Sequence, residues 1–512
     1  MAITNEEIKS QLDLLDNKIT NHNTFVQQIY SSNIDMASGT PKDVLLNNGE
    51  VIKNFKKAIQ DFNQEKNIAI SSIDESELKR LSAEVALLGG VSYGQYRPMN
   101  IGVAGKSGFG IGDTDSPVQG MSRKMTGNYT DDTGSWMCFF PISKMRIGHS
   151  ASPKYSTYRA NTVEIESLTA DEITAKVGTA YTTKANLDLG NGWFIPPNFV
   201  DGGFILKGVW VDKFGGGFEN GILKSKKGLE PVHSGTDIKH GPRFSDILVS
   251  GVSAGANRYD TAYNVVKSRG SDYAVTPNSF YAYINLIVQC QMQNATSVND
   301  VAWMDVQPYQ PKGNNNYLTD FNDTTVKYNQ ANSTNAGKST TGAVVNFEKT
   351  THDGSILGVA DINGSMLEIA SGFTRTNLNG FLTIKKSIAL KNLTSTTAFD
   401  VANFDAINIA DVVAGNDGWI CLGNGTNAVF ENTVASDRTF NGIPLATGVS
   451  VDGTNQFGKD GIYRYLADYL VPLRCGSWHH TFQAGSGYLA LYNVRTDSHN
   501  YVSVRAYRCQ YV

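Results

Sequence analysis

Charged residues are scarce in this chain, and long apolar runs are missing from it. Only 18% of the 512 residues are charged, against about 25% in typical soluble proteins. The 44 basic and 48 acidic side chains nearly cancel, which argues against a nucleic-acid-binding protein. No apolar run approaches the roughly 20 residues that cross a bilayer, and the polar start MAITNEEIKSQ is unlike a secretory signal. We therefore expect a protein made in the cytoplasm, with no nucleic-acid partner and no membrane insertion.

Cysteine is also sparse, and its spacing fits neither a metal site nor a disulfide framework. The five cysteines include no C-x-x-C pair, so we expect small buried thiols and leave only a Cys475–Cys509 pairing open. GVAGKSG at 102–108 is close to a phosphate-binding loop, but Asn100 stands where the first glycine belongs. Serine-hydrolase, zinc-protease and kinase motifs are missing as well. We expect no cofactor and no metal.

The first 90 residues have the apolar spacing of a coiled coil. Segments this short are marginal as isolated helices, so we expect them to bundle between copies of the chain; an amphipathic helix packed on its own domain is the alternative. LLGG at Leu87–Gly90 then supplies a helix stop. The first apolar run, at alternating steps of four and three residues, is Ile8, Leu12, Leu15, Ile19, Val26 and Ile29.

Beyond residue 90 the sequence is rich in glycine, serine, threonine and aromatic residues. Residues 134–148 and 203–217 are typical of strands, whereas 280–293 is typical of a helix. We expect an α+β protein with three parts. These are a helical coiled-coil region for oligomerisation and attachment at 1–90, a connecting β and loop segment at 91–130, and a β-rich domain at 131–512.

Five segments in a fixed order resemble the sulfatase-modifying-factor family, whose domain has a C-type-lectin-like fold. They are the three segments above, THDGSILGVADINGSMLEIASG at 351–372, and LRCGSW with AYRC near the end. The resemblance implies a formylglycine-generating-enzyme-like fold for the β-rich domain, and it identifies Asp361, Gly364 and Glu368 as retained motif residues. The family's oxidases bind copper through two closely spaced cysteines. Cys475 and Cys509 lie far apart, so the resemblance does not extend to that chemistry.

The chain is more similar to receptor-binding tail-fibre proteins of bacteriophages. This similarity includes the same order of segments, together with GNYTDDTGSWMCFFPISKMRIG, PKGNNNY and NGIPLATGVSVDG. Some of these are the variable proteins of diversity-generating retroelements, in which the exposed side chains of a C-terminal segment are replaced wholesale. The resemblance implies a non-enzymatic adhesin at the distal end of a virion tail fibre, which binds a host cell-surface receptor, either a protein or a glycan. It also implies a homotrimer that contacts other phage tail proteins through its N-terminal region.

The C-terminal segment at about 474–509 has the composition of a binding surface. Tyrosine, histidine and phenylalanine offer large rigid contact areas, and asparagine and aspartate adapt their hydrogen bonds to a partner. Small or apolar residues alternate with them, as in a framework that buries one set and displays the other. We expect Arg474, Trp478 and Arg508 to be scaffold. The expected receptor-binding residues are His479, His480, Phe482, Tyr488, Tyr492, Asn493, Arg495, Asp497, His499, Asn500 and Tyr501.

Two alternatives stay open. Any one of these tyrosines and histidines could be an ordinary packed residue. The alternative function is a tailspike-like enzyme that degrades host surface polysaccharide, which needs positioned carboxylates and usually a repeating β-solenoid; no fixed-period repeat is visible. The neighbours His479 and His480 would point to opposite faces of a strand, which disfavours joint metal ligation.

Overall fold

A computed structural model of the chain describes residues 135–158, 161–294, 352, 358–362, 364–407, 439–443, 461–465, 467–477, 480 and 485–511, together with short strands elsewhere. The chain divides into two compact units, Met1–Val85 and Ala86–Val512. In the first unit, β1 (Val44–Leu45) pairs with β2 (Val51–Ile52). The expected coiled coil and its LLGG stop lie outside the described residues. Within the described part of the chain, no helix is long and apolar enough to span a bilayer.

The second unit is rich in β-strands and contains few helices. Its first large sheet is antiparallel and brings the end of the chain beside much earlier segments, because Trp210 pairs with both Phe139 and Arg508. In order, its strands are β17 (Ala274–Val275), β33 (Ala506–Gln510), β12 (Gly208–Asp212), β5 (Ser135–Pro141), β3 (Pro98–Ile101) and β4 (Met121–Arg123).

The second large sheet is mixed and carries most of the C-terminal segment. Its β29–β31 and β22–β32 pairs are parallel, and the other pairs are antiparallel. In order, its strands are β26 (Gly418–Cys421), β29 (Gly461–Arg464), β31 (Leu489–Leu491), β30 (Leu473–Arg474), β22 (Leu367–Ile369) and β32 (Val502–Val504).

Smaller sheets and short helices complete this unit. One sheet has the order β7 (Val163–Ser167), β6 (Ser143–Ile147), β9 (Trp193–Phe194) and β8 (Asp188–Gly190), and another has β23 (Phe373–Thr376), β24 (Gly380–Ile384) and β25 (Phe404–Ala406). Two-stranded pairs are β10 (Val200–Asp201) with β11 (Phe204–Ile205), β13 (Gly217–Glu219) with β14 (Ile222–Lys224), and β15 (Leu248–Val249) with β16 (Val252–Ser253). Short helices are α4 (Tyr155–Tyr158), α5 (Ala170–Lys176) and α6 (Ala262–Val265).

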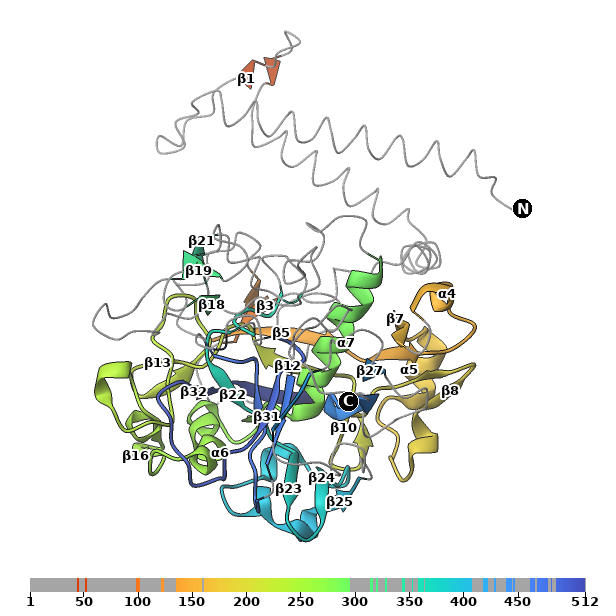
Figure 1. Ribbon diagram of the computed structural model, residues 1–512. Helices are drawn as coiled ribbons and strands as arrows, with labels where there is room; N and C mark the ends of the chain where they lie inside the picture. Colours follow the sequence, from red (N-terminus) through yellow and green to blue (C-terminus); the bar gives the residue numbers. More distant parts are fainter. Residues whose placement is uncertain are drawn as a thin grey trace. The chain divides into compact units, whose positions relative to one another are not determined.

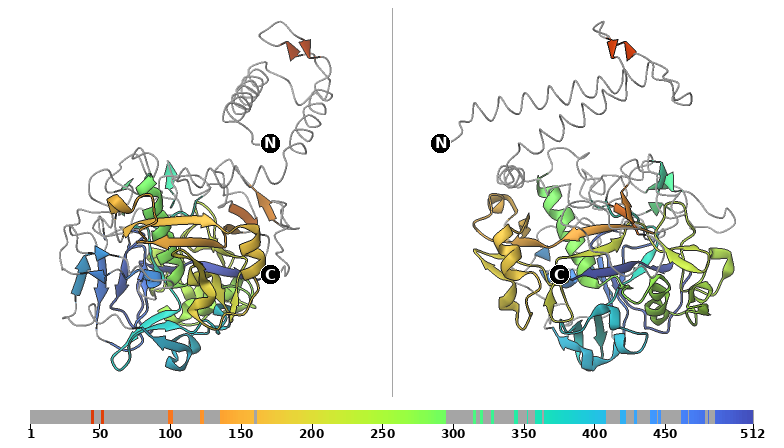
Figure 2. Two further views of the ribbon diagram at one scale, coloured as in Figure 1. Left: turned by 90° about the vertical axis from the view of Figure 1, so that its right-hand side faces the viewer. Right: turned by 180° about the vertical axis from the view of Figure 1, so that it is seen from behind.

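Helix α7 (Asn278–Asn294) lies in the interior of this unit, with strands of both large sheets passing beside it (Figures 1 and 2). From Phe280 to Cys290 every side chain of the helix is buried, so this stretch of the helix has no solvent face. Its Tyr283 hydroxyl lies 2.7 Å from the Ser143 hydroxyl of β6, and its Tyr281 hydroxyl lies 2.5 Å from the Glu368 carboxylate of β22. The helix therefore ties the second large sheet to the β6–β7 side of the unit.

A buried ion network joins the two large sheets. The Arg505 guanidinium donates from Nε and Nη2 to the two oxygens of Glu368, at 2.8 and 2.6 Å, and from Nη1 to the carbonyl of Asp212 at 2.7 Å. Asp212 also pairs with buried Arg269. Burial alone would lower the pKa of Arg505, but the Glu368 carboxylate raises it, and the net shift is upward. Charges that are buried in this way are stable only as pairs.

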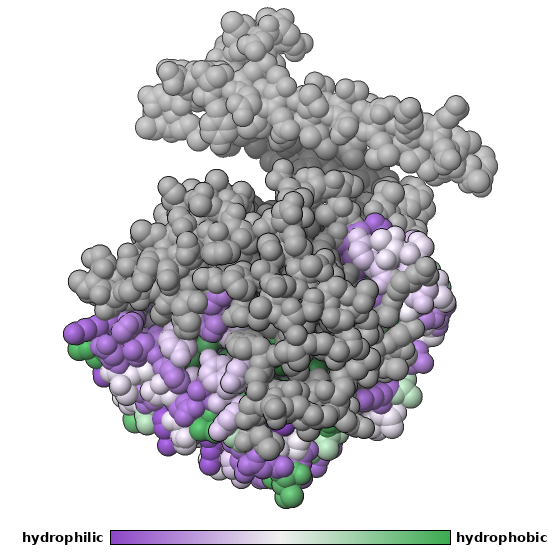
Figure 3. Space-filling view, viewed as in Figure 1, coloured by the Kyte–Doolittle hydropathy of each residue, from purple (hydrophilic) through white to green (hydrophobic). Residues whose placement is uncertain are grey.

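Several sequence expectations are confirmed. The segments 134–148 and 203–217 supply β5, β6, β11 and β12, and the expected helix is α7. Glu368 and Asp361 are both buried, a placement that the sequence did not predict, and Asp361 accepts the backbone N–H of Gly215 at 3.1 Å. Of the described cysteines, Cys475 and Cys509 are both free thiols and do not pair with each other. On the side shown in Figure 3, the described surface is mainly hydrophilic, with small separate apolar spots.

Candidate functional site

The site is built on one face of the second large sheet, around β31. Side chains on a strand alternate between its faces, so Tyr488, Ala490 and Tyr492 share a face. Tyr463 of β29 is the register partner of Ala490, so its side chain lies on the same face as these three residues. The Tyr463 and Tyr492 rings meet edge to face, with centroids 5.1 Å apart. Because Ala490 ends at Cβ, it leaves room above the strand for these rings.

Tyr488 is fully buried, at 0% exposure, and its hydroxyl is held by His480. The backbone N–H of Ser477 donates to His480 Nδ1 at 2.9 Å, so the neutral ring carries its proton on Nε2. That N–H donates to the Tyr488 hydroxyl at 3.0 Å. Burial raises the pKa of Tyr488 well above its usual value, with smaller contributions from Tyr492 and Tyr501. The expectation that Tyr488 is exposed to a receptor is therefore wrong, because its ring fills the core.

The loop that follows β31 is fastened to an earlier part of the chain. The backbone N–H of Tyr259 donates to the carbonyl of Asp497 at 3.0 Å, and the Tyr259 hydroxyl is hydrogen-bonded to His499 Nδ1 at 2.7 Å. The His499 and Tyr501 rings have centroids 5.0 Å apart. Burial lowers the pKa of His499 while Asp497 raises it, with a net downward shift. The lowered pKa favours the neutral form of the His499 ring near pH 7.

These aromatic side chains lie in one place. The pKa of Tyr259 is raised first by burial, and then by the nearby phenols of Tyr492 and Tyr501, the Asp497 carboxylate and the Tyr488 phenol. Half-buried Tyr492 and Tyr501 also act on each other, since Tyr501 contributes to the raised pKa of Tyr492 after burial. We call this group the Tyr–His cluster; its members are Tyr259, Tyr463, His480, Tyr488, Tyr492, His499 and Tyr501.

Three polar residues of the expected site shape or fasten the loop. Asn493 is 8% exposed, so the expectation that it is displayed is wrong. Its Nδ2 donates to Asp497 Oδ2 at 2.9 Å, and the Val494 backbone N–H donates to the same oxygen at 3.0 Å. Asn500 Nδ2 lies 3.2 Å from His240 Nδ1. Asn500 fits there because Gly235 has no side chain; a Cβ at that glycine would lie 1.8 Å from Asn500 Oδ1.

The other expected residues are outside the cluster or outside the described residues. The half-buried Arg495 guanidinium lies against the rings of Tyr469 and Phe399. His479, Phe482 and Trp478 lie outside the described residues. Arg474 is scaffold as expected: it is fully buried, and its Nε donates to Asn278 Oδ1 at 2.7 Å.

Sequence reasoning missed Tyr259 and Tyr463, which reach the cluster from other parts of the chain. Tyr259 lies 240 residues before its partner His499. Tyr463 precedes the anchor RCGSW, and only the parallel pairing of β29 with β31 brings it beside Tyr492. No local signal in the sequence marks either residue.

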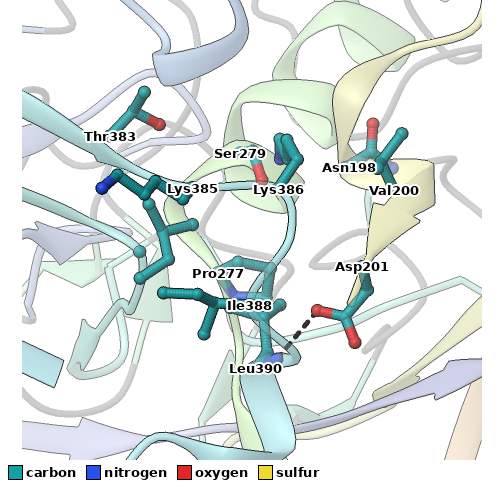
Figure 4. A pocket seen from close by; sticks show the side chains of 12 residues that line it. Asn198, Val200, Asp201, Pro277, Ser279, Thr383, Lys385, Lys386, Ile388 and Leu390 are labelled. Atoms are coloured by element: carbon teal, nitrogen blue, oxygen red, sulfur yellow. Dashed lines mark hydrogen bonds between the residues drawn. The ribbon is translucent and has the colours of Figure 1, made fainter. Parts of the chain in front are cut away.

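A polar pocket lies away from this sheet face, where β10 and β24 approach the start of α7 (Figure 4). Asp201 is the acidic side chain among the residues that line it, and burial raises the pKa of its carboxyl. Oδ1 accepts the Leu390 N–H at 2.8 Å, and Oδ2 accepts the Tyr511 hydroxyl at 2.5 Å. Asp201 therefore fastens the C-terminal end of β33. Among the described residues, no group of three or more His, Cys, Asp or Glu side chains could hold a metal ion.

Comparisons with known proteins give only distant similarities. No protein-family model matches the chain, and no curated protein matches it. Among solved structures, it is similar to the Major Tropism Determinant M1 variant, with 12% identity, coverage of 81% of this chain and 72% of that chain, and a TM-score of 0.26. The I1 variant gives 11% identity, 81% and 71% coverage, and a TM-score of 0.27. Values this low assign neither a fold family nor a function.

Proposed function

We propose that this protein is a phage tail-fibre adhesin that attaches the virion to a host cell-surface receptor through the Tyr–His cluster. The observation that carries the proposal is the set of contacts that links five phenols and two imidazoles from separate segments beside β31. The opposite face carries Glu368 and Arg474, which bond to the interior helix α7. Clustered tyrosines on a rigid support are typical of binding surfaces, because they add contact area with few torsions to immobilise.

Within this surface, we assign contact to the half-buried aromatic members and support to the rest. Tyr492, Tyr501 and His480 offer partly exposed rings, and His479 and Phe482 stay predicted contact residues. Tyr488, Asn493 and Asp497 hold the shape of the loop. Asn500 and His499 combine support with partial exposure. A few aromatic anchors of this kind typically supply most of the binding energy of an interface.

The finer features implied by the sequence resemblance belong to the same proposal. They are a C-type-lectin-like fold over 131–512, a connecting segment at 91–130, and a trimer formed through 1–90, which also contacts other phage tail proteins. Three copies on one fibre would raise avidity without any new contact. A segment whose outer side chains are exchanged, as in diversity-generating retroelements, suits a framework that keeps Leu489, Ala490 and Leu491 inside.

Adsorption of the purified chain to a panel of bacterial strains tests the proposal. We expect saturable binding to at least one strain, with losses of roughly thirtyfold in affinity for Tyr492→Ala and Tyr501→Ala. Tyr158→Ala, at a half-buried tyrosine of α4 outside the cluster, is the matched control and should bind like wild type. Equal binding by all three variants would remove the cluster from the site. Shortened surface polysaccharide after incubation would favour the tailspike alternative instead.

A further inference from the structure

The Arg495 guanidinium lies against two aromatic rings. Its guanidinium carbon lies 5.1 Å from the centre of the Tyr469 ring and 5.7 Å from that of Phe399. Both distances are within the range of a cation–π contact. Phe399 is buried, and Tyr469 is 40% exposed, so one ring anchors the guanidinium from below while the other lies at the surface.

The charge of Arg495 is not neutralised within the described part of the chain. None of the described residues forms an ion pair or a hydrogen bond with its guanidinium. Arg146, Arg269 and Arg505, by contrast, each have a carboxylate partner. A guanidinium that packs on aromatic rings without a carboxylate partner keeps its fork of N–H donors free for a planar anion, such as a carboxylate.

Tyr469 is held in an unusual backbone conformation. Its φ is +58°, a value that is rare for a bulky residue. The fold maintains it from both sides: Asp468 Oδ1 accepts the Asn377 N–H at 2.7 Å, and the Leu470 carbonyl accepts the Thr374 hydroxyl at 2.7 Å. Strain of this kind concentrates at binding and catalytic sites, where the surrounding structure enforces it. Here it places an exposed ring beside an unpaired guanidinium.

We propose that Arg495 and Tyr469 form a subsite for an acidic sugar of a cell-surface polysaccharide. The sugar carboxylate accepts hydrogen bonds from Arg495, and the apolar C–H face of the sugar ring lies on the exposed Tyr469 ring. A peptide carboxylate would use the guanidinium alone, whereas a uronic acid uses both groups. This inference rests on the proposed function, because Arg495 belongs to the same C-terminal segment, and it narrows the receptor to an acidic glycan.

Binding of oligogalacturonate to the full-length chain, with the carboxyl-reduced oligosaccharide as the uncharged counterpart, tests the subsite. We expect binding of the acidic form only, weakened by added salt. Arg495→Gln should reduce affinity by roughly tenfold or more, and Arg495→Lys, which keeps the charge but loses the fork, should restore only part of it. Arg243→Gln is the matched control, because that arginine is already paired with Asp246.

Tyr469→Asn separates binding from folding. Asparagine tolerates positive φ better than tyrosine, so the variant should unfold at the same or a higher urea concentration while it binds oligogalacturonate more weakly.

Wild-type affinity in Arg495→Gln, or equal binding of the carboxyl-reduced sugar, would overturn the subsite. Equal binding of a polyglutamate peptide would show that the acidic group is recognised and the sugar is not. If cells are bound through Tyr492 and Tyr501 without Arg495, this inference fails and the proposed function stands. If oligogalacturonate binds and no cells do, the proposed function fails.

Discussion

Tyr488→Ala separates the framework from the binding surface most directly. The Tyr488 ring is fully buried, its centroid lies 4.9 Å from that of His480, and its hydroxyl accepts a hydrogen bond from that histidine. Emptying a buried aromatic site usually lowers the free energy of unfolding by about 3 to 5 kcal/mol. Tyr488→Phe keeps the ring and removes only the hydroxyl contact, so it should lower the free energy of unfolding by about 1 kcal/mol.

Urea unfolding followed by tryptophan fluorescence measures both variants, because a shifted midpoint at constant slope reports a change in stability. Adsorption is then compared per folded molecule. Tyr492→Ala is the matched comparison, and it should shift the midpoint less, since its ring is already partly exposed. A Tyr488→Ala variant with the wild-type midpoint and no adsorption would refute this reasoning, because Tyr488 would then act as a contact residue.

Three further predictions concern the ion network, His499 and the assembly. Glu368→Ala leaves the Arg505 guanidinium buried without its carboxylate, so urea unfolding should show a loss of about 3 to 5 kcal/mol, and wild-type stability would contradict the pairing. The pKa of His499 is lowered by burial, so the unfolded chain binds its proton more readily. The contribution of His499 to the free energy of unfolding is therefore complete above the ordinary pKa of about 6.5, and it is lost as the pH drops below that value. His499→Gln should reduce the difference between urea midpoints measured at about pH 7.5 and about pH 5.5, and an unchanged difference would contradict this. Light scattering should give a trimer mass for the intact chain, and a monomer mass of 55.6 kDa would contradict the expected coiled coil.

The elements that could be predicted from the sequence are those with a strong local pattern. The run from Phe280 to Cys290 identifies α7, because a helix that is apolar nearly all round, with only Asn285 and Gln289 as amides, is expected to be buried. The run SWMCFFP identifies β5 for a similar reason. Arg474 could be assigned to the scaffold from its place in an anchor-like segment, and its full burial agrees. The buried role of Glu368 has no such local signal, since its partner Arg505 lies 137 residues away.

The division of the C-terminal segment into buried and displayed residues could not be predicted. The alternation Tyr488, Leu489, Ala490, Leu491, Tyr492 shows which side chains share a face, but both faces contain residues suited to a core. Tyr488 is buried because His480 and the sheet enclose it, whereas Tyr492 lies at the end of β31, where Tyr463 covers only part of its ring. Composition also gives the wrong prediction for Asn493. Its side-chain amide is not displayed, because it donates to Asp497 within the loop.

The contacts of this segment imply that its positions differ in how freely they can be exchanged. His499 and Asn500 are bonded to Tyr259 and His240, so replacing either one removes a contact that positions the loop itself. The rings of Tyr492 and Tyr501 are partly exposed, pack against the edge of the core and contact other aromatic members of the cluster, so we expect their replacement to change the surface more than the position of the loop. A binding surface that changes its specificity while keeping its fold would vary at positions such as Tyr492 and Tyr501. The fixed positions would then be those whose partners lie in residues 233–260, outside the C-terminal segment.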